Sequence, residues 1–409
     1  MCVLYRWEPP KWLSLDGLQG CDFMKLEGRR PMRQSTKRGE PHGEEQSPLR
    51  RFFPAKEQEM RKRFSICIPA FNRPRELLEL LSSIASEAPG DWEILVSEDG
   101  SPKRNEIVEV VNHFAREHTS LTIRFLRTPE NLGYDGNLRF LIDHAEGRYC
   151  VFMGDDDLWC AGALNELRKA IGAVPEVGVV LRAWQTISRN TGEVLDVHRY
   201  FPGDRMFKPG PETVAAFFRR SIFISGLTIC TDAARAIRTG KFDGTLLYQL
   251  HLVGTLLMTM PGYYLSQMTA IRRAGGEHYF GSSERERERF APRQLSAEHS
   301  LNFVRGLFDI AESLESAYGP EVGRLIRSDI ARYSYPLLAI QARSGTRSSF
   351  KHYASALSEL GLGKYLSFHL YRAALSLAGI RICDTLIGTS KRVLGSTPVM
   401  SGARGVRPS

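Results

Sequence analysis

The chain has 409 residues, of which 42% are hydrophobic, so it is long and apolar enough to bury a full core. Its formal net charge is +9, but residues 1–63 carry +5, residues 381–409 carry +4 and the stretch between them is neutral. The seven cysteines are scattered and form no C-x-x-C pair, which argues against a zinc site and against a disulfide framework.

The first 62 residues show no sustained hydrophobic period and are rich in Gly, Pro, Arg and Glu. We expect a disordered, basic N-terminal extension there. Arg6 and Glu8 interrupt any apolar leader segment. The longest apolar run, 246–260, is broken by Gln249 and His251 and is too short to span a bilayer. These features predict a cytoplasmic protein, whose basic ends are either solvated or in contact with an anionic surface.

From Phe64 onward, short apolar strands alternate with helical patterns. The predicted strands cover 64–68, 92–96, 121–126 and 149–153, and each of the first three is followed by a helix of about ten residues or more. Such alternation is typical of βαβ units with a mostly parallel sheet between helices. We therefore predict an α/β fold.

The second half of the chain is more mixed. A strand is predicted at 177–181, a hairpin turn at Gly192, and helices at 211–220 and 245–260. Several amphipathic helices follow, as far as about residue 380. The expected organisation is an extension over 1–62, an α/β domain over 63–280 and a helical region with a basic tail over 281–409.

Polar residues follow each of the first four predicted strands, where ligands bind in open α/β sheets. Three consecutive aspartates, Asp155, Asp156 and Asp157, come directly after the fourth strand. Hard oxygen ligands of this kind suit Mg²⁺ or Mn²⁺ shared with substrate phosphates. The alternative is a helix start whose dipole stabilises acidic residues, which fits one aspartate better than three.

The order of these motifs resembles the family 2 glycosyltransferases of GT-A fold, in particular bacterial surface-polysaccharide enzymes of the abequosyltransferase-like group. The motifs are P-A-F-N-R after the first strand, E-D-G-S after the second, E-N-L-G after the third and G-D-D-D-L-W after the fourth. The resemblance covers roughly residues 64–270. It implies a Rossmann-like nucleotide-sugar-binding domain.

The same resemblance implies the roles of individual residues. The nucleotide would be bound by Pro69, Ala70, Phe71, Asn72, Arg73, Glu98, Asp99, Asn131, Gly133, Asp135 and Asp155. Asp156 would be the main ligand of a divalent metal, Mn²⁺ or Mg²⁺, supported by Asp155 and Asp157. Because Gly154 replaces the first acid of the usual motif, a shifted metal pair of Asp155 and Asp157 stays open.

An acceptor hydroxyl must lose its proton during transfer, so the site needs a general base. In the family register, counted back from Gly254, this base falls on Asp243, which could equally be a helix N-cap. Ser225 and Gly226 are expected to line the acceptor pocket. Trp159 and Trp184 are candidates for stacking on sugars, with core packing as the alternative.

The predicted function is an inverting transfer of a sugar, from UDP in preference to other carriers, to an acceptor hydroxyl in bacterial cell-surface polysaccharide or glycolipid synthesis. The partners would be the nucleotide sugar and a carbohydrate or lipid-linked saccharide, without nucleic acid. A nicotinamide-dependent enzyme is excluded, because the first loop has no glycine. A sugar nucleotidyltransferase and a non-catalytic polysaccharide-binding protein are the alternatives.

The C-terminal helices around residues 365–382 have an apolar face flanked by basic residues. Such a face could lie in a bilayer interface, at the inner membrane surface, or could pack on the catalytic domain. The sequence leaves these two alternatives open.

Overall fold

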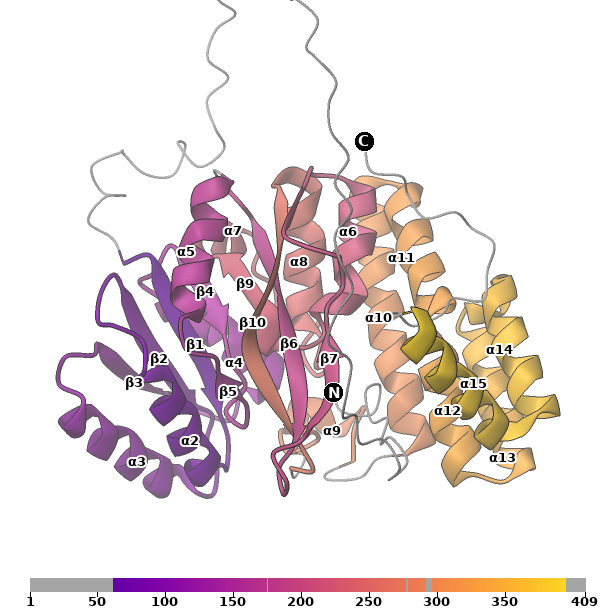
Figure 1. Cartoon of the computed structure of the whole chain (residues 1–409), viewed down its shortest axis with the longest axis horizontal. Coiled ribbons are helices and arrows are strands. Elements are labelled where there is room, and N and C mark those ends of the chain that lie inside the picture. Colours follow the sequence, from indigo (N-terminus) through magenta and orange to yellow (C-terminus); the bar gives the residue numbers. More distant parts are fainter. Residues whose placement is uncertain (1–61, 175, 277–278, 292–295, 395–409) are drawn as a thin grey trace, which may run out of the picture. The chain divides into compact units, whose positions relative to one another are not determined.

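The computed structural model describes residues 62–174, 176–276, 279–291 and 296–394, so the predicted N-terminal extension lies almost wholly outside the described residues. All of the described residues belong to one compact unit. Figure 1 shows a central sheet with helices on both faces and a group of helices after it in the chain. The predicted α/β fold is confirmed.

Ten strands form one mixed sheet, in the order β3-β2-β1-β4-β9-β6-β10-β5, with β7 paired to β6 and β8 paired to β10. Their bounds are β1 (Phe64–Ala70), β2 (Trp92–Glu98), β3 (Ile123–Arg127), β4 (Tyr149–Phe152), β5 (Leu158–Trp159), β6 (Val179–Ser188), β7 (Val194–His198), β8 (Arg205–Phe207), β9 (Leu227–Cys230) and β10 (Gly262–Ala274). The first four match the predicted strands closely.

The helices of the sheet region are α2 (Pro74–Ile84), α3 (Arg104–Glu117), α4 (Gly133–His144), α5 (Ala163–Ala173), α6 (Pro211–Phe218), α7 (Thr231–Ala236) and α8 (Tyr248–Thr259), with short 3₁₀ turns η3 (Arg219–Ser221) and η4 (Ile224–Gly226). Those after the sheet are α9 (Glu284–Arg287), α10 (Ala297–Tyr318), α11 (Pro320–Arg332), α12 (Tyr335–Ser344), α13 (Arg347–Glu359), η5 (Leu362–Lys364), α14 (Leu366–Leu377) and α15 (Gly379–Leu394).

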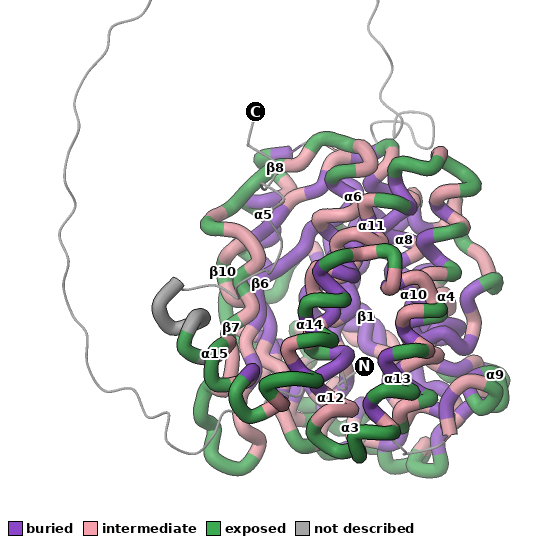
Figure 2. Tube along the Cα trace, turned by 90° about the vertical axis from the view of Figure 1, so that its right-hand side faces the viewer, coloured by how far each residue is buried: buried purple, intermediate pink, exposed green. Residues whose placement is uncertain are grey.

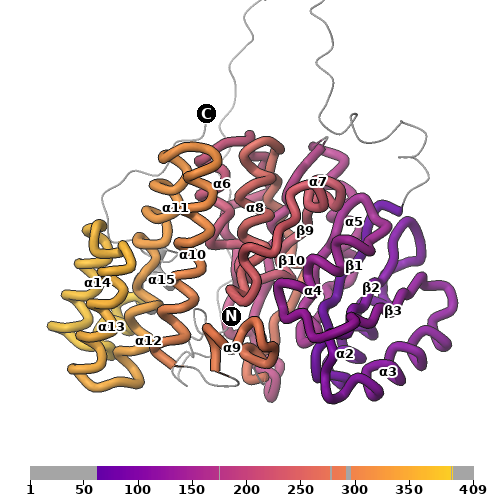
Figure 3. Tube along the Cα trace, turned by 180° about the vertical axis from the view of Figure 1, so that it is seen from behind, coloured from indigo at the N-terminus to yellow at the C-terminus, as the bar shows by residue number. Residues whose placement is uncertain are grey.

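Hydrophobic periodicity explains how the helices pack on the sheet. In α2, Leu77, Leu80, Leu81 and Ile84 are fully buried at helical spacing, and Pro74 occupies the first turn, where a missing N–H costs nothing. Helices α2 and α3 pack together on one face, whereas α4 contacts β1, β2, α7 and α8 (Figure 3). Every residue of β1, β2 and β4 except Pro69 is buried, because helices cover both faces of the sheet (Figure 2).

Strand β9 makes the sheet mixed. It runs antiparallel to β4 and to β6, so β6 is parallel to β4, and β10 is parallel to β6. The carboxyl ends of β1, β2, β3, β4, β6 and β10 therefore share one edge. Loops from both halves of the sheet meet at this edge, which we call the carboxyl edge.

The helices after the sheet continue the core. Helices α10 and α11 pack on α8 and α6, and α12 to α15 pack on α11 and on one another. Val304, Leu307 and Ile310 of α10 are buried in this way. The boundary expected at residue 281 is therefore crossed by extensive packing. Within the described ranges, no helix has the length and hydropathy to cross a membrane.

Candidate functional site

The three aspartates lie at the carboxyl edge, in the loop that leaves β4. Asp155 and Asp157 are buried, each about 4% exposed. The side chain of Asp156 keeps 29% of its surface exposed, compared with 5% for Asp155. The loop therefore turns two carboxylates into the protein and leaves one open to solvent.

Asp155 is held by the loop after β1. The backbone N–H of Phe71 donates to Asp155 Oδ2 at 2.9 Å, and Arg73 Nη1 donates to Oδ1 at 2.8 Å. Arg73 Nη2 also lies 3.4 Å from Asp156 Oδ2. Burial raises the pKa of Asp155 to about 6, although Arg73 opposes that rise. The expected nucleotide residues Phe71 and Arg73 thus fix the aspartate loop.

Ser225 fixes the other end of this loop. Its hydroxyl donates to Asp157 Oδ2 at 2.5 Å and accepts from the Gly154 N–H at 2.8 Å. Ser225 is fully buried, and Gly226 is buried beside it. The Ser225 hydroxyl therefore holds the aspartate loop, and the lining of an acceptor pocket by Ser225 and Gly226 stays a prediction.

Two arginines from the far half of the sheet bind to α2, and one of them also reaches the aspartate loop; no sequence motif indicates either residue. Arg273 of β10 donates from Nε to the Asp156 carbonyl at 2.8 Å and pairs with Glu79 of α2. Arg189, just after β6, pairs with Glu76 of α2 at 2.8 Å. Both arginines tie the second half of the sheet to α2 beside the aspartates.

A third arginine, Arg182 of β6, is fully buried inside the sheet. Its Nη2 donates to the carbonyls of Phe152 at 3.0 Å and Leu227 at 3.3 Å, which lie just past the last β4–β9 pair, Val151 with Thr228. Burial lowers the pKa of Arg182 to about 9. Arg182 thus bridges the two strands where the aspartate loop begins.

The expected nucleotide loops also reach the carboxyl edge. Pro69 and Ala70 end β1 beside Ser97 and Glu98 at the end of β2. Asn72 adopts a positive φ of 63°, which is uncommon for a residue other than glycine. Its buried Oδ1 has no hydrogen-bond partner. A buried acceptor left open in this way is suited to a ligand donor.

Glu98 and Asp99 have protein partners. Glu98 is fully buried; it accepts from the Ser101 N–H at 2.6 Å and forms an ion pair with Arg104 of α3. Asp99 Oδ1 accepts from Thr128 Oγ1 at 3.0 Å and from the Leu132 N–H at 2.7 Å. Burial raises the pKa of Asp99 to about 6. Contact between Glu98 and a base would require Arg104 to share this carboxylate.

At the start of α4, Asn131 Oδ1 accepts from the Gly133 N–H at 3.0 Å. Asp135 faces away from this loop. Its two oxygens accept from the N–H groups of Leu246 and Tyr248, each at 2.9 Å, at the start of α8. Asp135 is therefore a buried cap for α8, a structural role that the resemblance does not predict.

Asp243 lies in a turn five residues before α8, so it does not cap that helix. Arg139 of α4 holds both of its oxygens, and Arg285 of α9 lies 3.3 Å from Oδ2. Any proton transfer to Asp243 would first require these ion pairs to open.

The segment 279–291 lies over the loops that follow β1 and β3. The Tyr279 ring meets Phe71 edge-on at 5.9 Å and lies under the Arg73 guanidinium at 4.8 Å. Glu286 accepts from the Tyr134 N–H at 2.8 Å in the first turn of α4. Burial raises the pKa of Glu286. This segment therefore contacts both expected nucleotide loops.

The donor set fits a divalent metal only in part. Within the described residues, no three or more His, Cys, Asp or Glu side chains are grouped to hold an ion. Asp156 is the exposed carboxylate, whereas Asp155 and Asp157 are engaged by Arg73 and Ser225. One carboxylate suits an ion that takes its remaining ligands from a diphosphate and water, as Mg²⁺ commonly does.

Both candidate stacking tryptophans belong to the core. Trp159 is buried and donates from Nε1 to Glu87 at 2.8 Å. Trp184 is fully buried and stacks on His198 with ring centroids 3.5 Å apart. His251 of α8 also packs against an aromatic ring, that of Phe242.

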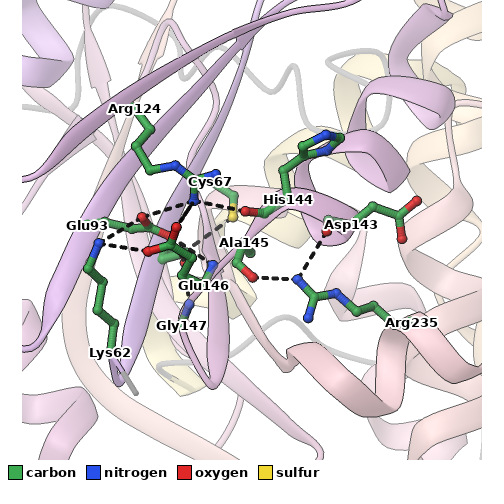
Figure 4. A network of polar contacts seen from close by, with 11 residues as sticks. Lys62, Cys67, Glu93, Arg124, Asp143, His144, Ala145, Glu146, Gly147 and Arg235 are labelled. Atoms are coloured by element: carbon green, nitrogen blue, oxygen red, sulfur yellow. Dashed lines mark hydrogen bonds and ion pairs between the residues drawn. The ribbon is translucent and has the colours of Figure 1, made fainter. Parts of the chain in front are cut away.

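A second polar cluster lies at the opposite, amino edge of the sheet (Figure 4). Buried Glu93 accepts from Ser65 Oγ at 2.6 Å and pairs with Lys62 and Arg124, each at 3.2 Å. Burial alone would raise the pKa of Glu93, but the Ser65 hydroxyl, the Glu146 N–H and Lys62 together lower it. Because its charges are paired and hydrogen-bonded, we interpret this cluster as structural.

Comparisons with known proteins agree with this arrangement. Residues 65–242 match the model of glycosyl transferase family 2. A Campylobacter jejuni GalNAc(5)-diNAcBac-PP-undecaprenol beta-1,3-glucosyltransferase is 31% identical over 105 residues, which are 26% of this chain and 33% of that protein. The Salmonella typhimurium abequosyltransferase RfbV is 31% identical over 115 residues, 28% of this chain and 34% of that protein. The chain thus spans about a third of the length of these relatives.

Among solved structures, S. aureus TarS 1–349 in complex with UDP-GlcNAc superimposes with a TM-score of 0.53 at 14% identity. The match covers 82% of this chain and 92% of that one. At this identity the likeness concerns the fold, which is the GT-A fold.

Proposed function

We propose that the protein transfers a sugar from a nucleoside diphosphate sugar to an acceptor hydroxyl, and the match of residues 65–242 to the model of glycosyl transferase family 2 supports this proposal. The observation that carries this proposal is the aspartate loop. Arg73, Ser225 and Arg273 each form a hydrogen bond with this loop. The Asp156 carboxylate stays partly exposed near the expected nucleotide loops. A site held rigid in this way before substrate binds favours catalysis by positioning.

We propose that the donor nucleotide occupies the loops after β1, β2 and β3. Asn72 offers an open acceptor there, and Asp99 lies at the end of β2. UDP is proposed over CDP because a carboxylate such as Glu98 can accept from the uracil N3–H, which cytosine lacks. Arg104 would have to share Glu98 for this contact to form.

Asp156 is the proposed ligand of a Mn²⁺ or Mg²⁺ ion, with Asp157 behind it. When bound, such an ion offsets the diphosphate charge and acts as a Lewis acid on the departing nucleotide. Ser225 keeps Asp157 in place, and Arg273 fixes the main chain of Asp156. These two residues position the loop.

Asp243 is proposed as the general base of a single-displacement, inverting transfer, on the strength of its place in the family register. Arg139 and Arg285 form ion pairs with its carboxylate, so this role requires both to release it when the acceptor binds. A saccharide linked to a lipid diphosphate is the proposed acceptor class, because relatives of the domain are named for such acceptors.

Release of UDP from UDP-sugars tests the proposed function. We expect release to depend on Mn²⁺ or Mg²⁺, and Asp156→Ala to abolish it, because the exposed carboxylate is lost. Asp309→Ala on α10 is the matched control and should keep full activity. Calorimetry should give tighter binding for UDP than for CDP.

Four outcomes would contradict parts of this proposal. Full activity in EDTA would remove the metal from the reaction. Tighter binding of CDP would overturn the preference for UDP. Formation of a sugar 1-phosphate and UTP from diphosphate would identify a nucleotidyltransferase, and nucleotide-sugar binding without turnover would identify a binding protein.

A further inference from the structure

The outer face of α14 and α15 exposes large apolar side chains in a regular pattern. On α14, Leu366, Leu370, Ala373 and Leu377 are all exposed, at spacings of four, three and four residues. This spacing places them on one side of the helix. Leu366 is 71% exposed and Leu377 is 88% exposed. The stripe therefore faces solvent along the whole of α14.

Helix α15 repeats this pattern with Ile382 and Leu386, which are 55% and 61% exposed. The opposite sides of both helices are packed against neighbouring helices. Phe368 and Leu375 of α14 are buried, and α14 and α15 contact α12 and each other. Figure 2 shows α14 and α15 with exposed stretches along their tubes. Packing against the rest of the protein, one of the two alternatives for these helices, therefore explains their inner faces but not their outer ones.

The residues around this apolar face are cationic. Lys364, Arg372 and Arg381 are exposed beside it. From 364 to 394 the chain has five Lys or Arg and a single acid, Asp384. That acid is paired with Arg343 at 2.8 Å. The face therefore combines exposed apolar side chains with a net positive charge.

We propose that the outer face of α14 and α15 docks on an anionic phospholipid bilayer, with its apolar stripe at the acyl boundary and its cations on the headgroups. An amphipathic helix with basic flanks binds membranes both by burying its apolar side chains and by electrostatic attraction to anionic headgroups. A second copy of this chain fits the face less well, because a symmetric contact would bring like charges together. The inference does not depend on the proposed transferase activity.

Co-sedimentation of the full chain with lipid vesicles tests this proposal without any donor or acceptor. We expect binding to vesicles of phosphatidylglycerol and phosphatidylcholine, and weak binding to phosphatidylcholine alone. Each basic residue near an anionic surface contributes about 1 kcal/mol, or roughly fivefold. The double variant Arg372→Glu/Arg381→Glu should therefore lower the partition coefficient at least tenfold.

A second variant removes the apolar term by the changes Leu377→Gln, Ile382→Gln and Leu386→Gln. Because these side chains are exposed, the variant should keep its circular dichroism spectrum and melting temperature while losing vesicle binding at least tenfold. The matched control changes exposed residues elsewhere, by Val194→Gln, Met206→Gln and Arg116→Glu. This control should bind vesicles like the native chain.

Three results would overturn the proposal. They are equal binding to neutral and anionic vesicles, unchanged binding of both α14–α15 variants, and a native dimer that the apolar variant converts to monomer in the absence of lipid. The last result would identify the face as a contact between two copies. If the native chain binds vesicles normally but releases no UDP from UDP-sugars, the transferase proposal is refuted and the membrane proposal stands.

Discussion

At the scale of single residues, the partner of each carboxylate decides which one is available to substrate. Asp155, Asp156 and Asp157 are adjacent in the chain, yet only Asp156 is substantially exposed. Arg73 neutralises Asp155, and the Ser225 hydroxyl holds Asp157. Since burial of an unpaired carboxylate is costly, these partners let two acids sit beneath the one that faces solvent.

Asp243→Asn tests the role of the proposed general base. General-base catalysis typically contributes about 10²–10⁴-fold, so we expect turnover to fall by roughly that factor. Donor affinity should stay the same, because Asp243 would contact the acceptor. Steady-state kinetics and calorimetry of the donor measure the two quantities separately.

Arg285→Met is the companion variant, since it removes one cation from Asp243 without removing the carboxylate. The Arg285→Met variant should keep most of the native turnover, in contrast to Asp243→Asn. If Asp243→Asn keeps near-native turnover and only lowers the melting temperature, Asp243 is an anchor between α4 and α9. The base must then be sought among other acids of the carboxyl edge.

At the scale of elements, α4 organises the second half of the domain. Asp135 in its first turn accepts hydrogen bonds from the N–H groups at the start of α8. Arg139, four residues later, forms an ion pair with Asp243 in the turn before α8. Burial raises the pKa of Asp135 to about 7. The link between these helices is therefore a buried carboxyl group whose charge depends on pH.

The raised pKa predicts how stability varies with pH. The folded chain keeps the Asp135 proton up to about pH 7, whereas the unfolded chain releases it near the ordinary value of 3.8. The folded state thus binds more protons between these values, and the free energy of unfolding falls as pH rises through them. The Asp135→Asn variant should be less stable than the native chain at every pH. Its free energy of unfolding should fall less as pH rises through this range.

Urea unfolding at about pH 5 and about pH 8 measures this difference. Asp99, whose pKa is also raised by burial, titrates in both proteins and serves as an internal control. An equal fall in the native chain and in Asp135→Asn would show that Asp135 is ionised in the folded protein throughout this range.

At the scale of the whole molecule, the α/β domain and the following helices share one core. Helix α10 packs on α8, and Arg219 next to α6 forms an ion pair with Asp329 of α11 at 2.9 Å. A methyl group added at Gly254 of α8 would lie 2.4 Å from Leu314 of α10, so these helices are in close contact. Residues beyond 280 therefore complete the domain that precedes them.

Deleting everything after residue 290 tests this dependence. The fragment would expose the faces of α6 and α8 that α10 and α11 cover, so we expect it to aggregate or to lack a cooperative thermal transition. A chain ending at residue 394 keeps every described helix and should melt like the full chain. A cooperative transition of the shorter fragment at the native temperature would contradict a shared core.

Local sequence patterns are enough to predict the first half of the sheet and the carboxyl edge that its strands form. Alternation of apolar strands with helices encodes βαβ units locally, and parallel strands must place their carboxyl ends together. The aspartate loop is recognisable for the same reason, since the three aspartates 155–157 begin three residues after the buried strand β4 ends at Phe152. Local pattern is sufficient for these features because each depends on neighbours in the chain.

The residues that surround this loop come together only through the tertiary fold. Strand β9 runs antiparallel between β4 and β6, and this topology brings Arg273 to the Asp156 carbonyl, Arg182 to the Phe152 carbonyl and Arg189 to Glu76. Likewise, the chain is folded so that Asp135 meets the start of α8, 111 residues later. Ion pairs and caps of this kind join residues whose separation in sequence has no period, so no local pattern predicts them.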